Sequence, residues 1–191
     1  MTIVEIIGAV VGLIYLRLEY KANILLWPAG VLMALLYIYI FFVSKFYADM
    51  GIHVYYLFAS IYGWFRWKKD AAAVGKVQVL SFPRRQWSAV LAVFTGLFGL
   101  IAAALYACTD SPIPFGDAFT TALSIVAMWL LAHKYMEQWL WWIAVNGIST
   151  GLYFWRGLYP TAILFVIYTA VSVLGYLKWR KMWREAAGHV L

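Results

Sequence analysis

The chain alternates long apolar runs with short polar breaks, and this pattern predicts helices that cross a bilayer. A helix needs about 20 apolar residues to span the hydrocarbon core. Seven runs reach or approach that length, over residues 3–20, 25–44, 51–68, 87–108, 117–133, 138–156 and 158–179. Prolines stand at several of the breaks, and one longer polar segment separates the third run from the fourth. The sequence therefore predicts an all-α integral membrane protein with seven transmembrane helices.

Composition strengthens this prediction. Hydrophobic residues make up 65% of the 191 residues and charged residues 12%, whereas a soluble domain is nearer half apolar and a quarter charged. A chain of this size cannot bury so many apolar side chains, so the surplus must face lipid. The cations that give the net charge of +7 flank the apolar runs and form no patch of their own, so we expect the lipid bilayer, and no nucleic acid, as partner. The N-terminus lacks a basic region before its apolar run, which indicates a first spanning helix and not a removable signal.

The distribution of Lys and Arg predicts an orientation. Seven crossings place all of these residues except Lys45 and Arg156 on one side of the membrane. Because positive residues gather on the cytoplasmic side, we expect the C-terminus inside and the N-terminus outside, in a bacterial inner membrane. The first span is the weakest of the seven, since Glu5, Arg17 and Glu19 crowd its ends.

The first and last thirds of the chain match at an offset of 112 residues. The matches include Trp27 with Trp139, Tyr56 with Tyr168, Ser60 with Ser172, Gly63 with Gly175 and Trp67 with Trp179. Shared membrane composition is the alternative explanation, since it makes aromatic matches common. A true repeat predicts two parallel three-helix repeats, at 1–69 and 111–191, joined by a basic cytoplasmic loop and linker helix at 70–110. This 3+1+3 arrangement is typical of transporters, which bind their substrate at the repeat interface near the midplane.

Polar residues at mid-helix indicate where such a substrate would bind. Asn146, Ser149 and Tyr153 share one face of the sixth run, and the Asn146 amide offers two donors and an acceptor near the midplane. Ser and Thr can instead bond to their own helix, an interpretation that we prefer for Thr121, Ser60 and Ser172. The other candidates for the cavity wall are Ser124, Met128 and Trp129 in the fifth run, Tyr168 in the seventh, Tyr56 in the third and Tyr37 in the second.

The residue types favour an organic cation as cargo. Aromatic faces bind flat heterocycles and cations, whereas every carboxylate lies near a helix end, which argues against a buried ion or proton relay and favours facilitated diffusion. The chain contains no enzyme motif, so we expect no catalytic residue, metal or cofactor. Two other classes stay open: a membrane assembly protein without cargo, and a lipid-acting enzyme built on Asp49 and His53.

Several motifs together resemble the Pnu family of bacterial vitamin transporters. They are the run from Asp117 to Ser124, the run Glu137-Gln-Trp-Leu-Trp-Trp, Gly151-Leu-Tyr153, Gly157-Leu-Tyr159, and in the first half Trp27-Pro28 and Tyr62-Gly63-Trp64. The resemblance covers nearly the whole chain. It implies a seven-helix fold similar to that of the SWEET sugar transporters, uniport of a vitamin, trapping of the cargo by a cytoplasmic kinase, and assembly as a homo-trimer.

The resemblance also suggests substrates and roles for individual residues. Members that carry nicotinamide riboside tend to have Gln at the position of Met128 and Asp at that of Asn146, and the stretch after Met128 is similar to thiamine-type members. We therefore favour thiamine, with nicotinamide riboside as the alternative and riboflavin behind both. The implied roles are a hydrogen bond from Asn146, stacking by Trp129, Tyr153 and Tyr168, selectivity from Ser124 and Met128, and equivalent first-repeat roles for Tyr56 and Trp64.

Overall fold

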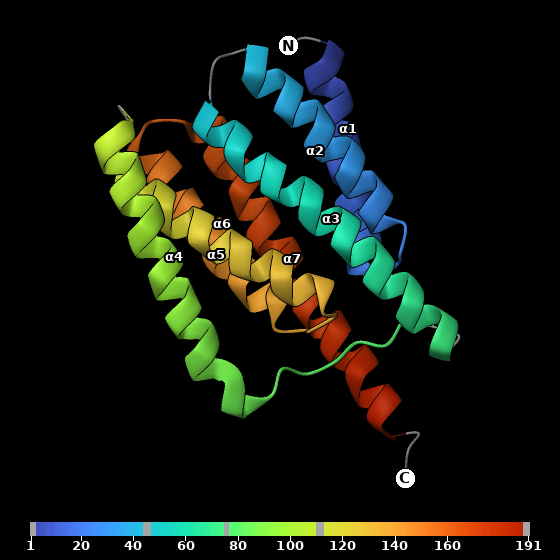
Figure 1. Ribbon diagram of the computed structural model, residues 1–191. Helices are drawn as coiled ribbons and strands as arrows, with labels where there is room; N and C mark the ends of the chain where they lie inside the picture. Colours follow the sequence, from blue (N-terminus) through green and yellow to red (C-terminus); the bar gives the residue numbers. More distant parts are fainter. Residues whose placement is uncertain (1–2, 44–46, 75–76, 110–112, 189–191) are drawn as a thin grey trace. The chain divides into compact units, whose positions relative to one another are not determined.

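The computed structural model describes residues 3–43, 47–74, 77–109 and 113–188, and most of this part of the chain is helical (Figure 1). Each of the seven predicted runs forms one α-helix. The helices are α1 (Ile3–Tyr20), α2 (Leu26–Val43), α3 (Tyr47–Val74), α4 (Trp87–Cys108), α5 (Pro114–Ala132), α6 (Gln138–Trp155) and α7 (Tyr159–Gly188), with a 3-10 turn, η1 (Arg84–Gln86), before α4. The all-α prediction with seven helices is therefore confirmed.

Four segments of the described chain are long and apolar enough to cross a membrane by length and composition: 26–43, 84–108, 114–132 and 159–186. The helices α1, α3 and α6 do not meet this criterion. Three charged residues lie in α1, while α6 carries Gln138, Asn146 and four tryptophans. Polar and amphipathic side chains within a bundle of apolar helices are typical of positions that face protein or cargo and not lipid.

The chain divides into two compact units. The first contains α1, α2 and α3 with residues 131–134 and the end of α7. The second contains all of α4 and α6 and most of α5 and α7. Within the first unit, α2 packs against both α1 and α3. The helix α3 is longer than its predicted span, and Figure 1 shows its C-terminal part running on past the turn between α1 and α2. This extra part is the site of a polar contact described below.

In the second unit, the polar segment before α4 is attached to the turn before α6. The Glu137 carboxylate accepts hydrogen bonds of 2.8 Å from both the Ser81 hydroxyl and the Phe82 backbone N–H. The Met136 N–H donates to the Leu80 carbonyl at 2.9 Å. The Phe82 ring is buried and packs edge-on against Trp87 and other aromatic rings. These contacts hold the segment on the helices even though it has almost no regular structure of its own.

The helix boundaries repeat at the offset of 112 residues that the sequence shows. Shifting α2 by this offset reproduces α6 at both ends, and shifting the start of α3 gives the start of α7. The turns before α2 and α6 also match, since each contains a non-glycine residue with positive φ, Ala22 at 49° and Lys134 at 62°. In both turns the N–H of this residue donates to the carbonyl three residues earlier, and the N–H of the next residue donates to the carbonyl five residues earlier. This pair of hydrogen bonds is the Schellman motif that ends a helix.

A buried pair of tryptophans holds two helices together in each unit. Trp27 meets Trp67 edge to face at 5.4 Å and 86°, and Trp139 meets Trp179 at 5.9 Å and 85°. All four side chains are at most 1% exposed. They fit because glycine faces one ring of each pair: a Cβ on Gly63 would lie 2.4 Å from Trp27, and one on Gly175 would lie 2.6 Å from Trp139. The two units therefore contain the same packing motif at matching positions.

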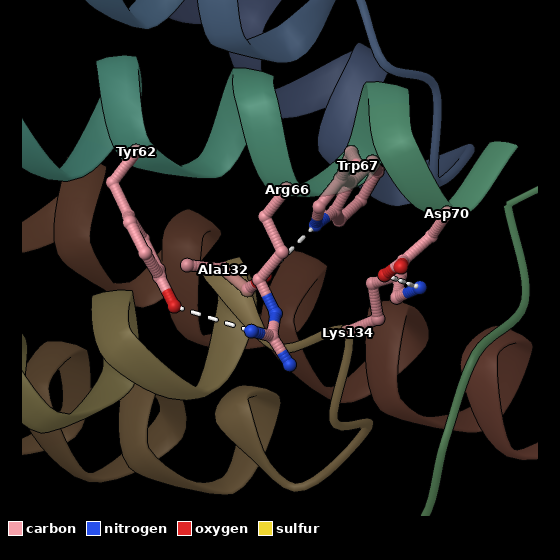
Figure 2. A network of polar contacts seen from close by, with 6 residues as sticks. All are labelled: Tyr62, Arg66, Trp67, Asp70, Ala132 and Lys134. Atoms are coloured by element: carbon pink, nitrogen blue, oxygen red, sulfur yellow. Dashed lines mark hydrogen bonds and ion pairs between the residues drawn. The ribbon is translucent and has the colours of Figure 1, made fainter. Parts of the chain in front are cut away.

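The C-terminal part of α3 contacts the turn 131–134 through polar groups (Figure 2). The Trp67 indole N–H donates to the Ala132 carbonyl at 3.2 Å. Three residues on, Asp70 forms an ion pair with Lys134, whose side chain is 7% exposed. This bond to the Lys134 ammonium lowers the pKa of Asp70, which lies beyond the predicted span 51–68. Arg66 donates to the Tyr62 hydroxyl alongside. The α5–α6 turn is thereby attached to α3.

Candidate substrate site

Each unit carries a stack of three rings at matching positions. The stacks are Phe41–His53–Tyr56 on α2 and α3, and Tyr153–Phe165–Tyr168 on α6 and α7. Phe41 and His53 have a ring-centroid distance of 5.1 Å and an interplanar angle of 50°, and Tyr153 and Phe165 have 5.1 Å and 47°. Their second contacts are 5.5 Å and 5.7 Å long. The geometry is shared while the chemistry differs, because an imidazole occupies the centre of one stack and a phenyl ring the centre of the other.

One face of α6 is more polar than the matching face of α2. Four positions of this face follow the spacing of one side of a helix. On α6 they are occupied by Trp142, Asn146, Ser149 and Tyr153. On α2 the matching positions are occupied by Gly30, Ala34, Tyr37 and Phe41. The buried tryptophan pairs and the glycines Gly63 and Gly175 that face them are the same in both copies. Packing alone would tolerate the same residues on both faces. The polar and aromatic face of α6 is therefore the strongest candidate for a surface that recognises cargo.

Asn146 lies at the centre of this face. Its side chain is 8% exposed, and its Nδ2 donates to the Ser172 Oγ on α7 at 3.1 Å. The Ser172 hydroxyl donates in turn to the Tyr168 carbonyl at 2.8 Å. Nearby, Ser149 and Tyr153 continue the face toward the ring stack. It is the Tyr168 backbone carbonyl, and not its ring, that takes part in this chain of hydrogen bonds.

Trp142 belongs to this face and was missed in the sequence analysis. Its ring is half-buried against the apolar cluster of the second unit, and its buried Nε1 has no hydrogen-bond partner within the described part of the chain. A buried N–H without an acceptor is costly unless a ligand or water supplies one. The signal that could have identified it is the contrast with Gly30 at the matching position of α2.

The other predicted site residues lie in several places. Met128 and Ser124 are buried on α5, and the Ser124 hydroxyl bonds to the Thr120 carbonyl of its own helix. Trp129 is 41% exposed and contacts Phe82 and Tyr135 beside the loop before α4, so its contacts link it to that loop.

In the first unit, Tyr37 and Tyr56 both pack on His53, at ring distances of 5.0 Å and 5.5 Å. Trp64 is half-buried on α3. Asp49, which the enzyme alternative pairs with His53, has a side chain outside the described ones. His53 itself packs against the rings of Tyr37, Phe41 and Tyr56.

Comparison with known proteins identifies the family. The model of the nicotinamide mononucleotide transporter family matches residues 2–181. The chain belongs to this family. It is 28% identical to the nicotinamide riboside transporter PnuC of Escherichia coli strain K12 over 98% of this chain and 89% of that protein. It is also 28% identical to the riboflavin/roseoflavin transporter RibM of Streptomyces davaonensis, over 92% and 83% of the two chains.

The fold has a counterpart among solved structures. The crystal structure of the vitamin B3 transporter PnuC superposes with a TM-score of 0.74 at 26% identity, covering 93% of this chain and 80% of that one. The family and these relatives are transporters and not enzymes. The protein is therefore a multi-pass inner-membrane transporter of a vitamin. The resemblance to the Pnu family is confirmed. The expectation of thiamine as cargo finds no support among these relatives, whose names point to nicotinamide riboside and riboflavin.

Proposed function

We propose that the protein carries nicotinamide riboside across the inner membrane. The observation that carries this proposal is the similarity to a nicotinamide riboside transporter along 98% of the chain. The face of α6 supports it, because Trp142 and Tyr153 offer flat surfaces to a pyridinium ring and Asn146 offers hydrogen bonds to an amide or a hydroxyl group. Riboflavin is the second candidate, on the strength of the similarity to RibM.

Equilibrium binding to the detergent-purified protein tests the substrate. The 11 tryptophans provide a fluorescence signal for titrations with nicotinamide riboside, riboflavin and thiamine. We expect the riboside to bind most tightly. Tighter binding of riboflavin would move the protein to the second candidate, and tighter binding of thiamine would restore the interpretation that the sequence first favoured. If none of the three binds, the proposed function is overturned.

A substitution tests the α6 face. Asn146→Leu keeps the volume but removes every polar atom, so we expect nicotinamide riboside to bind at least tenfold more weakly, the effect of losing one or two hydrogen bonds. Thr150→Val is the matched control, because the Thr150 hydroxyl bonds only to the Asn146 carbonyl of its own helix. Equal affinities of Asn146→Leu and wild type would exclude Asn146 from the site.

The transport mode that we propose is uniport. No carboxylate lies at mid-helix, and the two buried ones among the described side chains, Glu19 and Glu137, lie at helix ends, so we infer that no acid couples a proton or sodium ion at the midplane. Uptake into proteoliposomes should then equilibrate the vitamin without concentrating it, and should be the same with and without a sodium or proton gradient. Accumulation driven by either gradient would contradict uniport. Phosphorylation by a cytoplasmic kinase would keep the vitamin inside the cell.

We also propose the finer architecture that the sequence predicts. Repeats at 1–69 and 111–191 around a linker at 70–110, in a SWEET-like 3+1+3 arrangement, are supported by the matching helix boundaries and tryptophan pairs. The bias of Lys and Arg supports a cytoplasmic C-terminus and an external N-terminus. Assembly as a homo-trimer rests on the family resemblance. Cysteine labelling from either side of the membrane tests the orientation, and light scattering with correction for detergent tests the trimer.

A further inference from the structure

The hydrogen bonds around Asn146 determine which way its amide faces. A serine hydroxyl has one proton. The Ser172 proton is used at 2.8 Å on the Tyr168 carbonyl, so at 3.1 Å from Asn146 the Ser172 oxygen can only accept. The amide must therefore present its NH₂ group to α7, and its Oδ1 must face away from Ser172.

The Oδ1 atom of Asn146 is left for a ligand. Among the described residues, no protein group donates to it, and it is not one of the side-chain oxygens that are fully shut off from solvent. An amide carbonyl in a largely buried position is costly without a donor. The requirement is met if the cargo supplies an N–H or O–H group at this point.

The matching position in the first unit shows what Ser172 does. Ser60 is its counterpart on α3, is fully buried, and has no hydrogen-bond partner for its Oγ within the described chain. The residue opposite Ser60 at the Asn146 position is Ala34. Both copies therefore contain a serine at this position, but only in the second unit does an amide side chain, that of Asn146, bond to the serine.

We propose that Ser172 is a positioning residue that holds the Asn146 amide with its Oδ1 toward the cargo, so that the transporter selects a vitamin with a hydrogen-bond donor at that point. The proposal rests on the proposed function, because it assigns a role to Ser172 in the same site. Ser172 does not contact the cargo. The hydrogen bond to Ser172 excludes the opposite orientation of the Asn146 amide. In that orientation the NH₂ group would face the cargo and would bind a hydrogen-bond acceptor.

The test compares the affinity for nicotinamide riboside in matched variants of the full chain. Ser172→Ala frees the amide to rotate, and we expect the affinity to fall about tenfold, the value of one hydrogen bond. Ser60→Ala removes a hydroxyl of equal size and burial that has no partner, and we expect less than a twofold change. Thermal unfolding of both variants in detergent checks that the fold is intact.

Two further variants separate positioning from a structural role. In an Asn146→Ala background, adding Ser172→Ala should change the affinity no further, because there is no amide left to orient. Asn146→Asp keeps an acceptor toward the cargo, so it should bind far better than Asn146→Leu. A Ser172→Ala effect that persists without Asn146, an affinity like that of wild type in Ser172→Ala, or equal losses in Asn146→Asp and Asn146→Leu would each overturn the proposal. Absence of vitamin binding to wild type would instead overturn the proposed function, and the role of Ser172 with it.

Discussion

Gly63→Ala tests the packing motif that the two units share. The added Cβ would lie 2.4–2.5 Å from three carbons of the Trp27 six-membered ring, whereas carbon atoms in contact prefer about 3.5–4.0 Å. Trp27 and its partner Trp67 are both 0% exposed, so the ring has no free space to move into. The helices must separate instead, which costs about 1–3 kcal/mol for overpacking. We expect a value in the upper half of that range, because the overlap exceeds ~1 Å.

Alanine is otherwise the better helix former, by about 0.5–1 kcal/mol over glycine. The control must therefore be a Gly→Ala substitution that gains the same helix propensity without a steric clash. Gly147→Ala provides it, because Gly147 lies within α6 and a Cβ there would meet nothing within 4 Å. The difference between the two variants isolates the contact with Trp27, and we expect it to be about 2–3 kcal/mol in stability.

Thermal unfolding in detergent measures the difference. For a chain of this size, 1 kcal/mol corresponds to about 2–4 °C in Tm, so Gly63→Ala should melt about 4–12 °C below Gly147→Ala. Gly175→Ala should behave like Gly63→Ala, since its Cβ would lie 2.6–2.7 Å from Trp139. The reasoning would be refuted if Gly63→Ala melted at the same temperature as Gly147→Ala.

Two further predictions concern contacts near the loops. Asp70→Asn breaks the ion pair with Lys134 and should lower stability by about 1 kcal/mol near pH 7, a small value because the Asp70 side chain is 39% exposed. Since the pair lowers the pKa of Asp70, its stabilisation is present above the unfolded value of about 3.9 and is lost as the pH falls through the folded one. The melting temperatures of wild type and Asp70→Asn should therefore converge in acid, and a constant difference would contradict the assignment. Glu137→Ala leaves the buried Phe82 N–H without its acceptor, at a cost of about 1–3 kcal/mol. The loop should then open more often, so trypsin should cut at the exposed Arg84 several times faster than in wild type, and an unchanged rate would show that Glu137 does not hold the loop.

Much of the fold could be predicted because a membrane limits the choices. Each apolar run had to become a helix, and the predicted ends of α1 and α4 coincide with those observed. The ends of α3 and α7 were placed too early. Hydropathy marks where a helix leaves the hydrocarbon, but backbone hydrogen bonding continues into water wherever good helix formers follow, so α3 extends to Val74 and carries Asp70 with it.

The candidate site was harder to predict, because residue type alone does not give a side chain's neighbours. Asn146 stood out as an amide in the middle of an apolar run. Trp142 did not, since tryptophan in a membrane protein is usually an interfacial residue, and the burial of its Nε1 is seen only in the structure. Ser172 had been assigned to bonding with its own helix. It does so, through Tyr168, but its oxygen also accepts from Asn146.

The two copies of the helical frame explain why these residues are found together. Nicotinamide riboside has a charged aromatic ring and a sugar, so a surface that binds it must offer both aromatic rings and hydrogen-bonding groups. The face of α6 that contains Asn146 and Tyr153 offers both, whereas the matching face of α2 has Ala34 and Phe41. The tryptophan pairs, the glycines Gly63 and Gly175, and the serines Ser60 and Ser172 are the same in both copies. The polar groups of the α6 face are therefore added to a packing motif that both copies keep, which is why Asn146, bonded to a serine that the other copy leaves unpaired, is the strongest functional signal among the described residues.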